Sequence, residues 1–301
     1  MGKAEGREMM TSSTKVGIGG KNGSLTPLLS SLSELVGNWQ LATTSRTRMA
    51  TQAKTILVSL IGKPGSGKGT YGALLAKRYK NLTFLSVGDV LRDSAKRNET
   101  LRKVLTSGKL VDDTIVNEAV IESLQERNLQ QLKKHSSNDN IANILSDGRE
   151  TVILDGFPRT EAQTKLLSEW PSTLEPALAI YFDVPDDIVI TKLLGRRKCT
   201  ICGGNFNVNG VDQDGWDMPP LLPTNDCTEK CNWDMDWEKR DDDTADIIKE
   251  RMQVFREETE PVLESWSRDG RLLKFVPYKG VKEMGRLAGE LENYFHQHSL
   301  T

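Results

Sequence analysis

A glycine-rich loop that carries one central lysine is the part of this sequence best suited to chemistry. It runs from Gly62 to Thr70 and reads GKPGSGKGT. Glycines let the backbone wrap closely around a polyphosphate and point its N–H groups inward, and Lys68 adds a full positive charge for the outer phosphates. The usual pattern has a hydroxyl residue directly after the lysine, whereas here Gly69 intervenes and Thr70 supplies the hydroxyl.

The residues on either side of this loop fit a strand before it and a helix after it. An apolar, β-branched run over 56–61 precedes the loop, and a helical pattern that includes Ala73, Leu74 and Leu75 follows it. A glycine-rich turn without a ligand is the alternative. The strand–loop–helix context favours a phosphate-binding loop, because the start of the helix adds partial positive charge next to Lys68.

Arginines form the second group of candidates. An exposed arginine is usually a solvated charge, but guanidinium groups that converge can hold several phosphates in bidentate fashion. The five that stand at predicted strand ends, helix ends or acidic pairs are Arg92, Arg159, Arg196, Arg240 and Arg251. The three histidines, His135, His296 and His298, lie in a predicted loop and near the C-terminus, so a histidine base has no place in the site. Phosphoryl transfer needs mainly alignment and charge neutralisation, which lysine, arginine and Mg²⁺ provide.

All four cysteines lie in one segment. Cys199 and Cys202 have the spacing of a zinc knuckle, whereas Cys227 and Cys231 are one residue further apart and a wide gap separates the pairs. Such clustering favours a structural zinc site over a dispersed disulfide framework, and four thiolates would leave no open coordination position. The alternative is four reduced cysteines in a segment held by hydrogen bonds and tryptophans. These are Trp216, Trp233 and Trp237.

The composition narrows the class of protein. Of the 301 residues, 37% are hydrophobic and 27% are charged, and the formal net charge is -2. These values are typical of a globular domain and give no basic field that would attract nucleic acid or an acidic membrane. No apolar run reaches the length of a membrane span. We therefore expect small-molecule partners, and neither nucleic acid nor membrane.

Short apolar segments alternate with helical patterns along the chain. Strands are predicted over 56–61, 82–86, 151–155, 177–184 and 271–276. The later helices are predicted from 87 to about 107, from 114 to 132, from 162 to 170, from 186 to 197, from 243 to 266 and from 281 to 296. Asp243 is the expected N-cap of its helix, and residues 135–150 are expected to be a surface insertion. The alternation predicts a doubly wound α/β fold with a mostly parallel, five-stranded sheet, whose ligands bind at the carboxyl ends of the strands.

The first 52 residues differ from the rest of the chain. They are rich in Ser, Thr and Gly, and basic residues outnumber acidic ones. One reading is an organelle-targeting leader, although Glu5 and Glu8 are unusual in a transit peptide. The other is a disordered tail, or an extension upstream of Met49. We expect a core over 53–301 in an intracellular protein, cytoplasmic or, with a targeting leader, mitochondrial or plastid.

The motifs of the core, taken in order, resemble those of the adenylate kinases. They are GKPGSGKGT, SVGDVLR, SGKLV, ILDGFPRTEAQ, LLGRR and a later R-D-D-D…R. The resemblance extends from Lys54 to the C-terminus. It implies a P-loop NTPase type of fold with an AMP-binding flap over 86–111 and an inserted lid over 195–243, in a monomer. The implied activity is the reversible, Mg²⁺-dependent reaction of ATP and AMP to two ADP, which serves adenine nucleotide homeostasis.

The resemblance also implies roles for individual residues. Those expected to bind ATP are Gly65, Ser66, Gly67, Lys68, Gly69, Thr70, Lys192 and Arg196. Those expected to bind AMP are Val87, Arg92, Lys109, Leu110, Val111, Gly156, Phe157, Arg159, Gln163, Arg240 and Arg251. The catalytic set is Lys68, Arg159, Arg196, Arg240 and Arg251. Asp155 and Asp242 would support Mg²⁺ or orient the arginines, and the four cysteines would hold the structural zinc that some members carry in the lid.

Three positions bear on the choice of nucleotide. The amide of Gln163 can pair with the adenine edge, whereas the related UMP/CMP kinases have an asparagine in the GFPR segment and a short lid. Val87 replaces a frequent threonine, and Lys192 replaces an arginine that often stacks on the ATP base, so modest changes in nucleotide affinity are expected. Alternatives are a kinase for another monophosphate, a kinase that uses GTP as donor, and a catalytically silent nucleotide-binding module. The intact lysine and arginines argue against the silent module.

Overall fold

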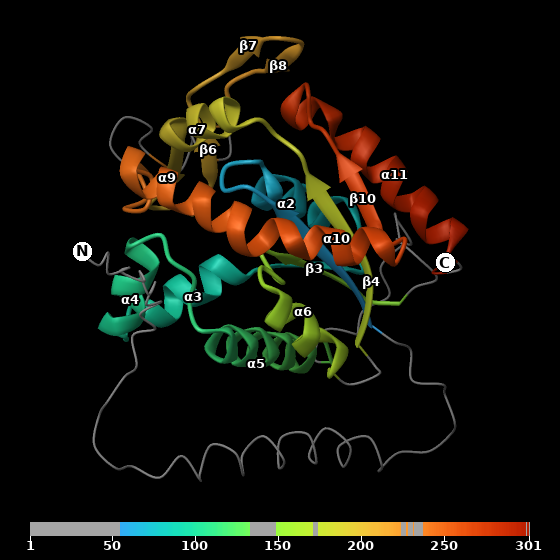
Figure 1. Cartoon of the computed structure of the whole chain (residues 1–301). Helices are drawn as coiled ribbons and strands as arrows, with labels where there is room; N and C mark the ends of the chain where they lie inside the picture. The colour runs from blue at the N-terminus through green and yellow to red at the C-terminus, as the bar shows by residue number, and fades with distance from the viewer. Residues whose placement is uncertain are drawn as a thin grey trace, which may run out of the picture. The chain divides into compact units, whose positions relative to one another are not determined.

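Five parallel strands form the sheet at the centre of the computed structural model (Figure 1). Their spatial order is β10–β4–β1–β3–β2, so the strand that precedes the glycine-rich loop lies in the middle. The strands are β1 (Thr55–Gly62), β2 (Leu82–Ser86), β3 (Thr151–Asp155), β4 (Leu174–Phe182) and β10 (Leu272–Phe275). Each strand overlaps one of the five predicted strands, and the predicted doubly wound α/β fold is confirmed.

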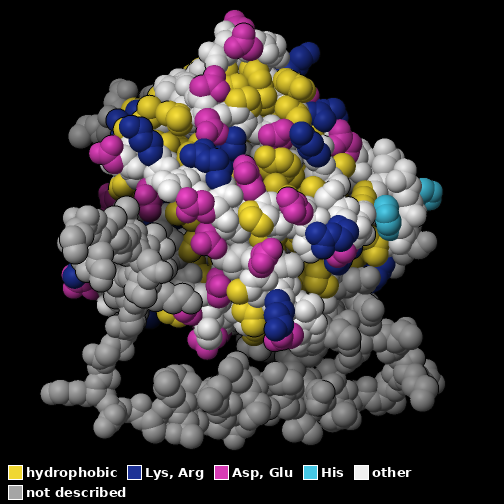
Figure 2. Space-filling model, in the orientation of Figure 1, with side chains coloured by type: hydrophobic (Ala, Val, Ile, Leu, Met, Phe, Trp, Pro, Cys, Tyr) yellow, Lys and Arg dark blue, Asp and Glu magenta, His cyan; other side chains and the backbone are white. Residues whose placement is uncertain are grey.

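The structure describes residues 55–132, 149–170, 174–223, 227, 231, 237–298 and 300. Three predictions concern residues outside these ranges: the leader over 1–52, most of the surface insertion over 135–150, and the packing role of Trp233. Among the described helices, none combines the length and the apolar character that a membrane span requires. Figure 2 shows acidic and basic side chains interspersed over one face of the molecule, as expected from a net charge of -2.

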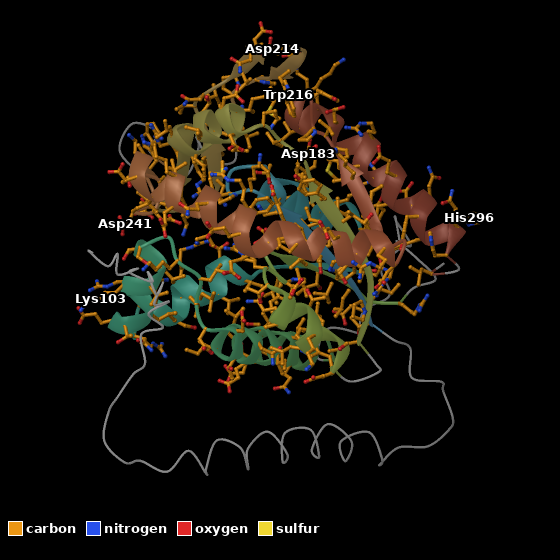
Figure 3. All side chains as sticks on the ribbon, viewed as in Figure 1. Lys103, Asp183, Asp214, Trp216, Asp241 and His296 are labelled. Carbon is orange, nitrogen blue, oxygen red and sulfur yellow. The ribbon has the colours of Figure 1, made fainter. Side chains whose placement is uncertain are left out.

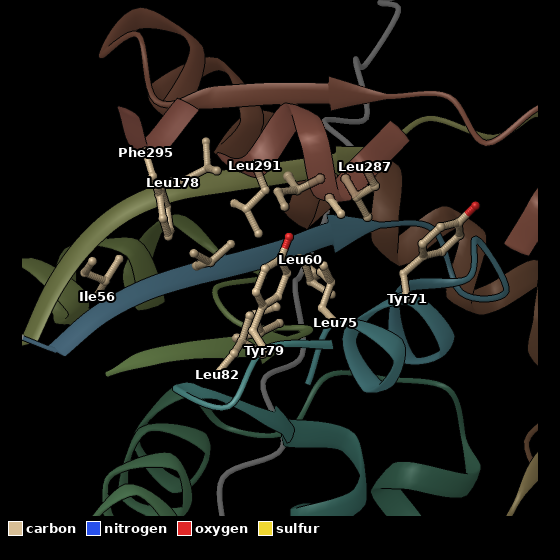
Figure 4. Close-up of a cluster of buried hydrophobic side chains, with 14 of the residues drawn as sticks. Ile56, Leu60, Tyr71, Leu75, Tyr79, Leu82, Leu178, Leu287, Leu291 and Phe295 are labelled. Atoms are coloured by element: carbon tan, nitrogen blue, oxygen red, sulfur yellow. The ribbon is translucent and has the colours of Figure 1, made fainter. Parts of the chain in front are cut away.

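Strand β1 is buried on both faces of the sheet, which explains its continuous apolar sequence. Ile56, Val58 and Leu60 point to one face, and Leu57 and Ile61 point to the other. On the first face they pack with α2 (Lys68–Arg78) and α11 (Met284–Gln297), and Figure 4 shows this cluster. The opposite face is covered by α3 (Val87–Ala95), α5 (Asp113–Leu132), α6 (Glu161–Ser168) and α10 (Glu260–Arg268).

Two predicted helices are interrupted in the structure. The helix expected over 87–107 is divided into α3 and α4 (Glu99–Thr106), because the Asn98 side chain accepts a hydrogen bond from the Leu101 N–H and caps a new helix. The helix expected over 243–266 consists of α9 (Ala245–Val254), a π-helical turn (Phe255–Thr259) and α10.

Two helix ends also differ from prediction. The helix expected over 186–197 is α7 (Asp186–Gly195), and Arg196 begins strand β5 instead of ending the helix. Thr244, not Asp243, occupies the N-cap of α9. Both carboxylate oxygens of Asp243 instead accept from the Arg196 guanidinium.

The segment between α7 and α9 forms small antiparallel sheets of its own. Strands β5 (Arg196–Cys199), β6 (Asn205–Asn207) and β9 (Trp237–Glu238) pair in the order β6–β5–β9. Strands β7 (Val211–Gln213) and β8 (Trp216–Met218) form a separate hairpin, which lies at the top of Figure 1. These strands lie within residues 195–243, over which the resemblance implies a lid.

Candidate active site

A cavity lies at the carboxyl ends of the parallel strands. Gly62, Ser86 and Asp155, the last residues of β1, β2 and β3, all line it. Residues of the inserted segment line it as well, among them Asn205 and Leu221. The cavity is therefore where the fold class predicts a ligand.

The glycine-rich loop wraps around the end of this cavity, and all its residues from Pro64 to Thr70 line it. Gly65 has a φ of 84°, and a Cβ there would lie 2.7 Å from the Leu193 side chain. Gly67 has a φ of 97° directly before α2. Two positions in the loop thus require glycine, one of them through close approach to α7 as well as through backbone conformation.

Lys68 is buried and its ammonium is held inside the loop. The Nζ atom donates to the Gly62 carbonyl at 2.6 Å and to the Lys63 carbonyl at 2.8 Å. Burial lowers the pKa of Lys68 to about 7, and the nearby carboxylate of Asp155 only partly opposes this effect. A polyphosphate brought to this loop would favour the charged form of the lysine.

All five predicted arginines line the same cavity as Lys68. Arg196 makes a bidentate ion pair with Asp243 at 2.6 and 2.7 Å, and the Asp243 side chain is only 1% exposed. Arg251 donates to Asp242 at 2.7 Å, and Arg159 donates to the Gly156 carbonyl at 3.0 Å. These contacts hold the guanidinium groups in place at the cavity wall.

The remaining two arginines share an acidic partner. Arg92 donates to Asp89 at 2.6 Å, and Arg240 lies 3.8 Å from the same carboxylate oxygen. Burial and neighbouring guanidinium groups lower the pKa of Arg240 to about 10 and likewise that of Arg251 to about 10. A concentration of positive charge that depresses the pKa of arginine is suited to a ligand with several negative charges.

The two predicted Mg²⁺-supporting carboxylates lie in different surroundings. Asp155 lines the cavity, and burial raises its pKa although Lys68 and Arg159 oppose the shift. Burial alone would raise the pKa of Asp242, but the guanidinium groups of Arg251 and its neighbours outweigh burial and lower it. Asp242 is therefore held by Arg251, and of these two carboxylates only that of Asp155 lines the cavity.

Several residues predicted for the AMP pocket lie behind the cavity wall instead of lining it. Val87 and Val111 are buried in the core on the second face of the sheet. Phe157 is fully buried and stacks on Trp170, with ring centroids 5.7 Å apart. Lys109 likewise does not line the cavity, whereas Leu110 and Gly156 do.

Gln163 is also behind the wall. Its Nε2 donates to Asp113 at 2.7 Å and its Oε1 accepts from the Arg159 N–H at 2.7 Å. These two bonds hold the amide between Asp113 and the backbone of Arg159, and each leaves one donor or acceptor position of the amide unused. Gln163 does not line the cavity, and its contact with the adenine edge stays a prediction.

Two carboxylates that pair with arginines of the cavity were missed from the sequence. Asp89 lies three residues before Arg92 on α3, a spacing that predicts an ion pair on one helix face. Asp243 stands in a run of three aspartates, and nothing in the run distinguishes the one that pairs with Arg196.

Lys192, predicted to contact the ATP base, lines the cavity from α7. Its Nζ atom lies 2.9 Å from the Asn209 carbonyl and 3.3 Å from the Met218 carbonyl. Burial lowers its pKa. Its ammonium is thus directed at the backbone of the inserted segment.

The four cysteines come together in the inserted segment. Their Sγ atoms all lie within 4.8 Å of one another, and Cys202 Sγ lies 3.6 Å from Cys227 Sγ. Sulfur atoms that bind one tetrahedral zinc at about 2.3 Å are about 3.8 Å apart. The donor set and its spacing therefore fit a structural zinc site.

The chain is similar to several known proteins. A family model described as an AAA domain matches residues 61–200. A GTP:AMP phosphotransferase of Plasmodium falciparum is 35% identical over 242 residues, which cover 79% of this chain and 96% of the relative. An adenylate kinase of Chlamydia trachomatis is 34% identical over 72% of this chain and 82% of its own length. A probable chloroplastic adenylate kinase 6 of Oryza sativa is 33% identical over 74% of this chain and 72% of its own length.

Proposed function

This chain belongs to the adenylate kinase family of nucleoside monophosphate kinases, and we propose that it transfers a phosphoryl group reversibly from ATP to AMP, giving two ADP. The observation that carries the proposal is the convergence of Lys68 and five arginines on one cavity that also contains the glycine-rich loop. Two nucleotides that meet end to end carry several phosphates, and this cluster has the charge to hold them.

The roles of the residues follow from their positions. The loop N–H groups and Lys68 would hold the donor phosphates, while Arg159 and Arg92 would hold the acceptor phosphate. Arg196 and Arg251 would neutralise the group in transfer. Magnesium bound with the triphosphate would neutralise further charge, and Asp155 and Thr70 are the cavity residues that could hold it.

The inserted segment brings a second contribution. Arg196 and Arg240 lie at its two ends, so closure of residues 195–243 over the nucleotides would complete the charge cluster. Closure would also exclude water, which would otherwise accept the phosphoryl group. We include in the proposal that residues 86–111 form the flap over AMP.

The function is tested by ADP formation from AMP with Mg²⁺ and either ATP or GTP, followed by a panel of other monophosphates. We expect AMP to be the preferred acceptor and a dinucleotide that joins two adenosines through phosphates to inhibit. If another monophosphate is preferred, AMP is not the natural acceptor. If GTP is preferred, ATP is not the natural donor. A GTP donor is favoured by one observation, that the Plasmodium relative is named a GTP:AMP phosphotransferase. No turnover with any pair would support the silent binding module.

Binding of the triphosphate should take up a proton at alkaline pH. Lys68 has a pKa of about 7 before binding, and the negative charge of the triphosphate raises it. At pH 8 most of the lysine must gain a proton on binding, so affinity should fall as pH rises above 7, by at most about tenfold per unit. Calorimetry in two buffers of different ionisation enthalpy would show uptake approaching one proton per site. Equal enthalpies in the two buffers, or uptake retained in Lys68→Met, would contradict this assignment.

We propose that the four cysteines hold one structural zinc. Protein purified without added metal should contain about one zinc per chain, and a chelator should lower the melting temperature. Cys231→Ser should reduce the zinc content and the melting temperature together, because Cys231 is buried within the cluster. A zinc content near zero in folded, active protein would instead support four reduced cysteines.

For the rest of the chain, we propose a leader over 1–52 ahead of a monomeric core over 53–301. The relatives that are described as chloroplastic favour an organelle-targeting role for the leader. Sequencing the N-terminus of protein isolated from its native source tests this, since an uncut N-terminus would favour the tail. Light scattering tests the monomer.

A further inference from the structure

The β7–β8 hairpin is docked on a loop of the core. The Asp217 N–H donates to the Tyr278 carbonyl at 2.8 Å, and the Asp217 carboxylate lies 3.1 Å from the Lys282 ammonium. The rings of Trp216 and Tyr278 pack with their centroids 5.0 Å apart. Figure 3 shows Asp214 at the outer tip of the hairpin and Trp216 nearer the body of the molecule. The hairpin thus makes backbone, charge and ring contacts with one short stretch of the core.

A second contact ties the hairpin to the helix below it. Gln213 on β7 donates to the Asp187 carboxylate at 2.6 Å, and Asp187 lies in the first turn of α7. The hairpin is therefore fixed on two sides, to α7 and to the loop that follows β10.

The neck of this hairpin is closed by Lys192. The Nζ atom reaches the Asn209 carbonyl at 2.9 Å, just before β7, and the Met218 and Pro219 carbonyls at 3.3 and 3.5 Å, at the end of β8. An ammonium has three donors, and these three carbonyls account for them. Lys192 is half-buried, so these contacts replace the water that it has lost.

The docked hairpin supplies one wall of the active-site cavity. Met218 and Pro219 line the cavity, as do Pro277, Gly280 and Val281 from the loop on which the hairpin rests. A Cβ on Gly280 would lie 3.4 Å from Met218, so the two walls are nearly in contact. The Tyr71 hydroxyl of α2 donates to the Gly280 carbonyl at 2.5 Å, which places this end of the cavity beside the helix that follows the phosphate-binding loop.

The two ends of the cavity differ in chemistry. All five arginines are grouped with one another and with Asp89, Asp155 and Asp242 through contacts and pKa effects. Around the hairpin, the lining includes the apolar side chains of Met218, Pro219, Pro277 and Val281, and the polar ones of Lys192 and Asn207. Phosphates belong at the first end and an apolar ring system at the second. Because the phosphate-binding loop lies between the ends, the apolar end is suited to the base of the donor.

We propose that the β7–β8 hairpin is a clamp on the donor base, and that Lys192 is a positioning residue that closes the neck of the clamp. The inference rests on the proposed function, because that function supplies a triphosphate donor. Lys192 then acts on the base through the backbone at Asn209 and Met218. The resemblance had implied a contact between Lys192 and the ATP base itself. In this proposal Lys192 does not stack on the base.

Steady-state kinetics with each nucleotide varied in turn tests the clamp. Lys192→Met should raise the KM of the donor about five- to tenfold, an effect expected from the loss of charged hydrogen bonds, and change the acceptor KM and kcat less than twofold. Lys192→Arg, which can donate to the same carbonyls, should restore most of the donor affinity. Lys198→Met is the matched control, since Lys198 lies in β5 of the same inserted segment and does not line the cavity.

An unchanged donor KM in Lys192→Met, or an equal rise in both KM values, would overturn the clamp. If Lys192→Met does not fold, Trp216→Ala provides the second test. It removes the ring contact with Tyr278 at the far side of the hairpin and should also raise the donor KM selectively. A Trp216→Ala variant with wild-type donor KM would overturn the proposal equally.

Calorimetric binding of a non-hydrolysable ATP analogue separates this inference from the proposed function. Wild-type protein that binds the analogue but transfers no phosphate would overturn the proposed function alone. In that case, the Kd of Lys192→Met for the analogue, divided by the Kd of wild type, tests whether the hairpin is a clamp on the base. A ratio of about five or more supports it, and a ratio of one overturns it.

Discussion

Replacing Lys68 with methionine is expected to lower kcat by about 10²- to 10³-fold, equivalent to about 3–4 kcal/mol of transition-state stabilisation. The ammonium is buried in the phosphate-binding loop, within 2.8 Å of two of its carbonyls, so it is already positioned where charge would develop. Methionine keeps most of the length of the side chain and loses its terminal ammonium with the charge and the donors. ADP formation under saturating nucleotides measures the effect, and circular dichroism establishes that the fold is retained.

Lys63→Met is the matched control in the same loop. Lys63 does not line the cavity, and its ammonium lies 2.5 Å from Asp186 and 3.1 Å from the Val184 carbonyl. Its removal should change kcat by no more than about fivefold, because a partly exposed ion pair contributes little. Equal losses in Lys63→Met and Lys68→Met would mean that loop integrity, and not the Lys68 charge, limits transfer.

Arg251→Ala is expected to have the second large effect, a loss of about 10²- to 10³-fold in kcat. Arg251 projects from α9 into the cavity, where Asp242 fixes its guanidinium at 2.7 Å. Since neither partner is more than 16% exposed, alanine would also leave Asp242 without its cation, and we expect some loss of thermal stability. Rapid-quench measurement of a single turnover separates the chemical step from nucleotide binding.

Arg256→Ala is the comparison for this variant. Arg256 lies five residues further along the same helical stretch, and its guanidinium pairs with Asp186 at 3.0 Å on the half-exposed surface. It does not line the cavity. Its removal should leave kcat within about twofold of wild type. If Arg251→Ala were as active as Arg256→Ala, the role of Arg251 in transfer would be wrong.

The sheet and the phosphate-binding loop could be predicted from the sequence because both depend on local patterns. Strand β1 is a continuous apolar run since both its faces are buried, and its break into glycines marks the loop. The arginines could be chosen because each stands at a predicted strand end, at a helix end or near an acidic pair. All five line the cavity at the carboxyl ends of the parallel strands.

The direction of side chains could not be predicted in this way. Gln163 and Phe157 follow β3 in the motif, but their side chains turn inward to Asp113 and Trp170. A motif gives residue types and spacing, whereas orientation depends on partners far away in the sequence. The docking of the β7–β8 hairpin on Tyr278 could not be predicted for the same reason. Tyr278 and Lys282, which bind Asp217 of the hairpin, are more than sixty residues away from it in the sequence.

One ion pair has a consequence for how this protein can change in evolution. Arg196 is the first residue of the inserted segment after α7, and Asp243 is among the last before α9, so their bond joins the two ends of the insertion at its base. The entropic contribution to the free energy of closing a flexible loop grows only by about 0.6 kcal/mol for each doubling of the loop length. The residues between Arg196 and Asp243 could therefore be lengthened, shortened or exchanged as one unit while the central sheet stays the same. Relatives could differ widely in this segment and still share the same parallel sheet and phosphate-binding loop.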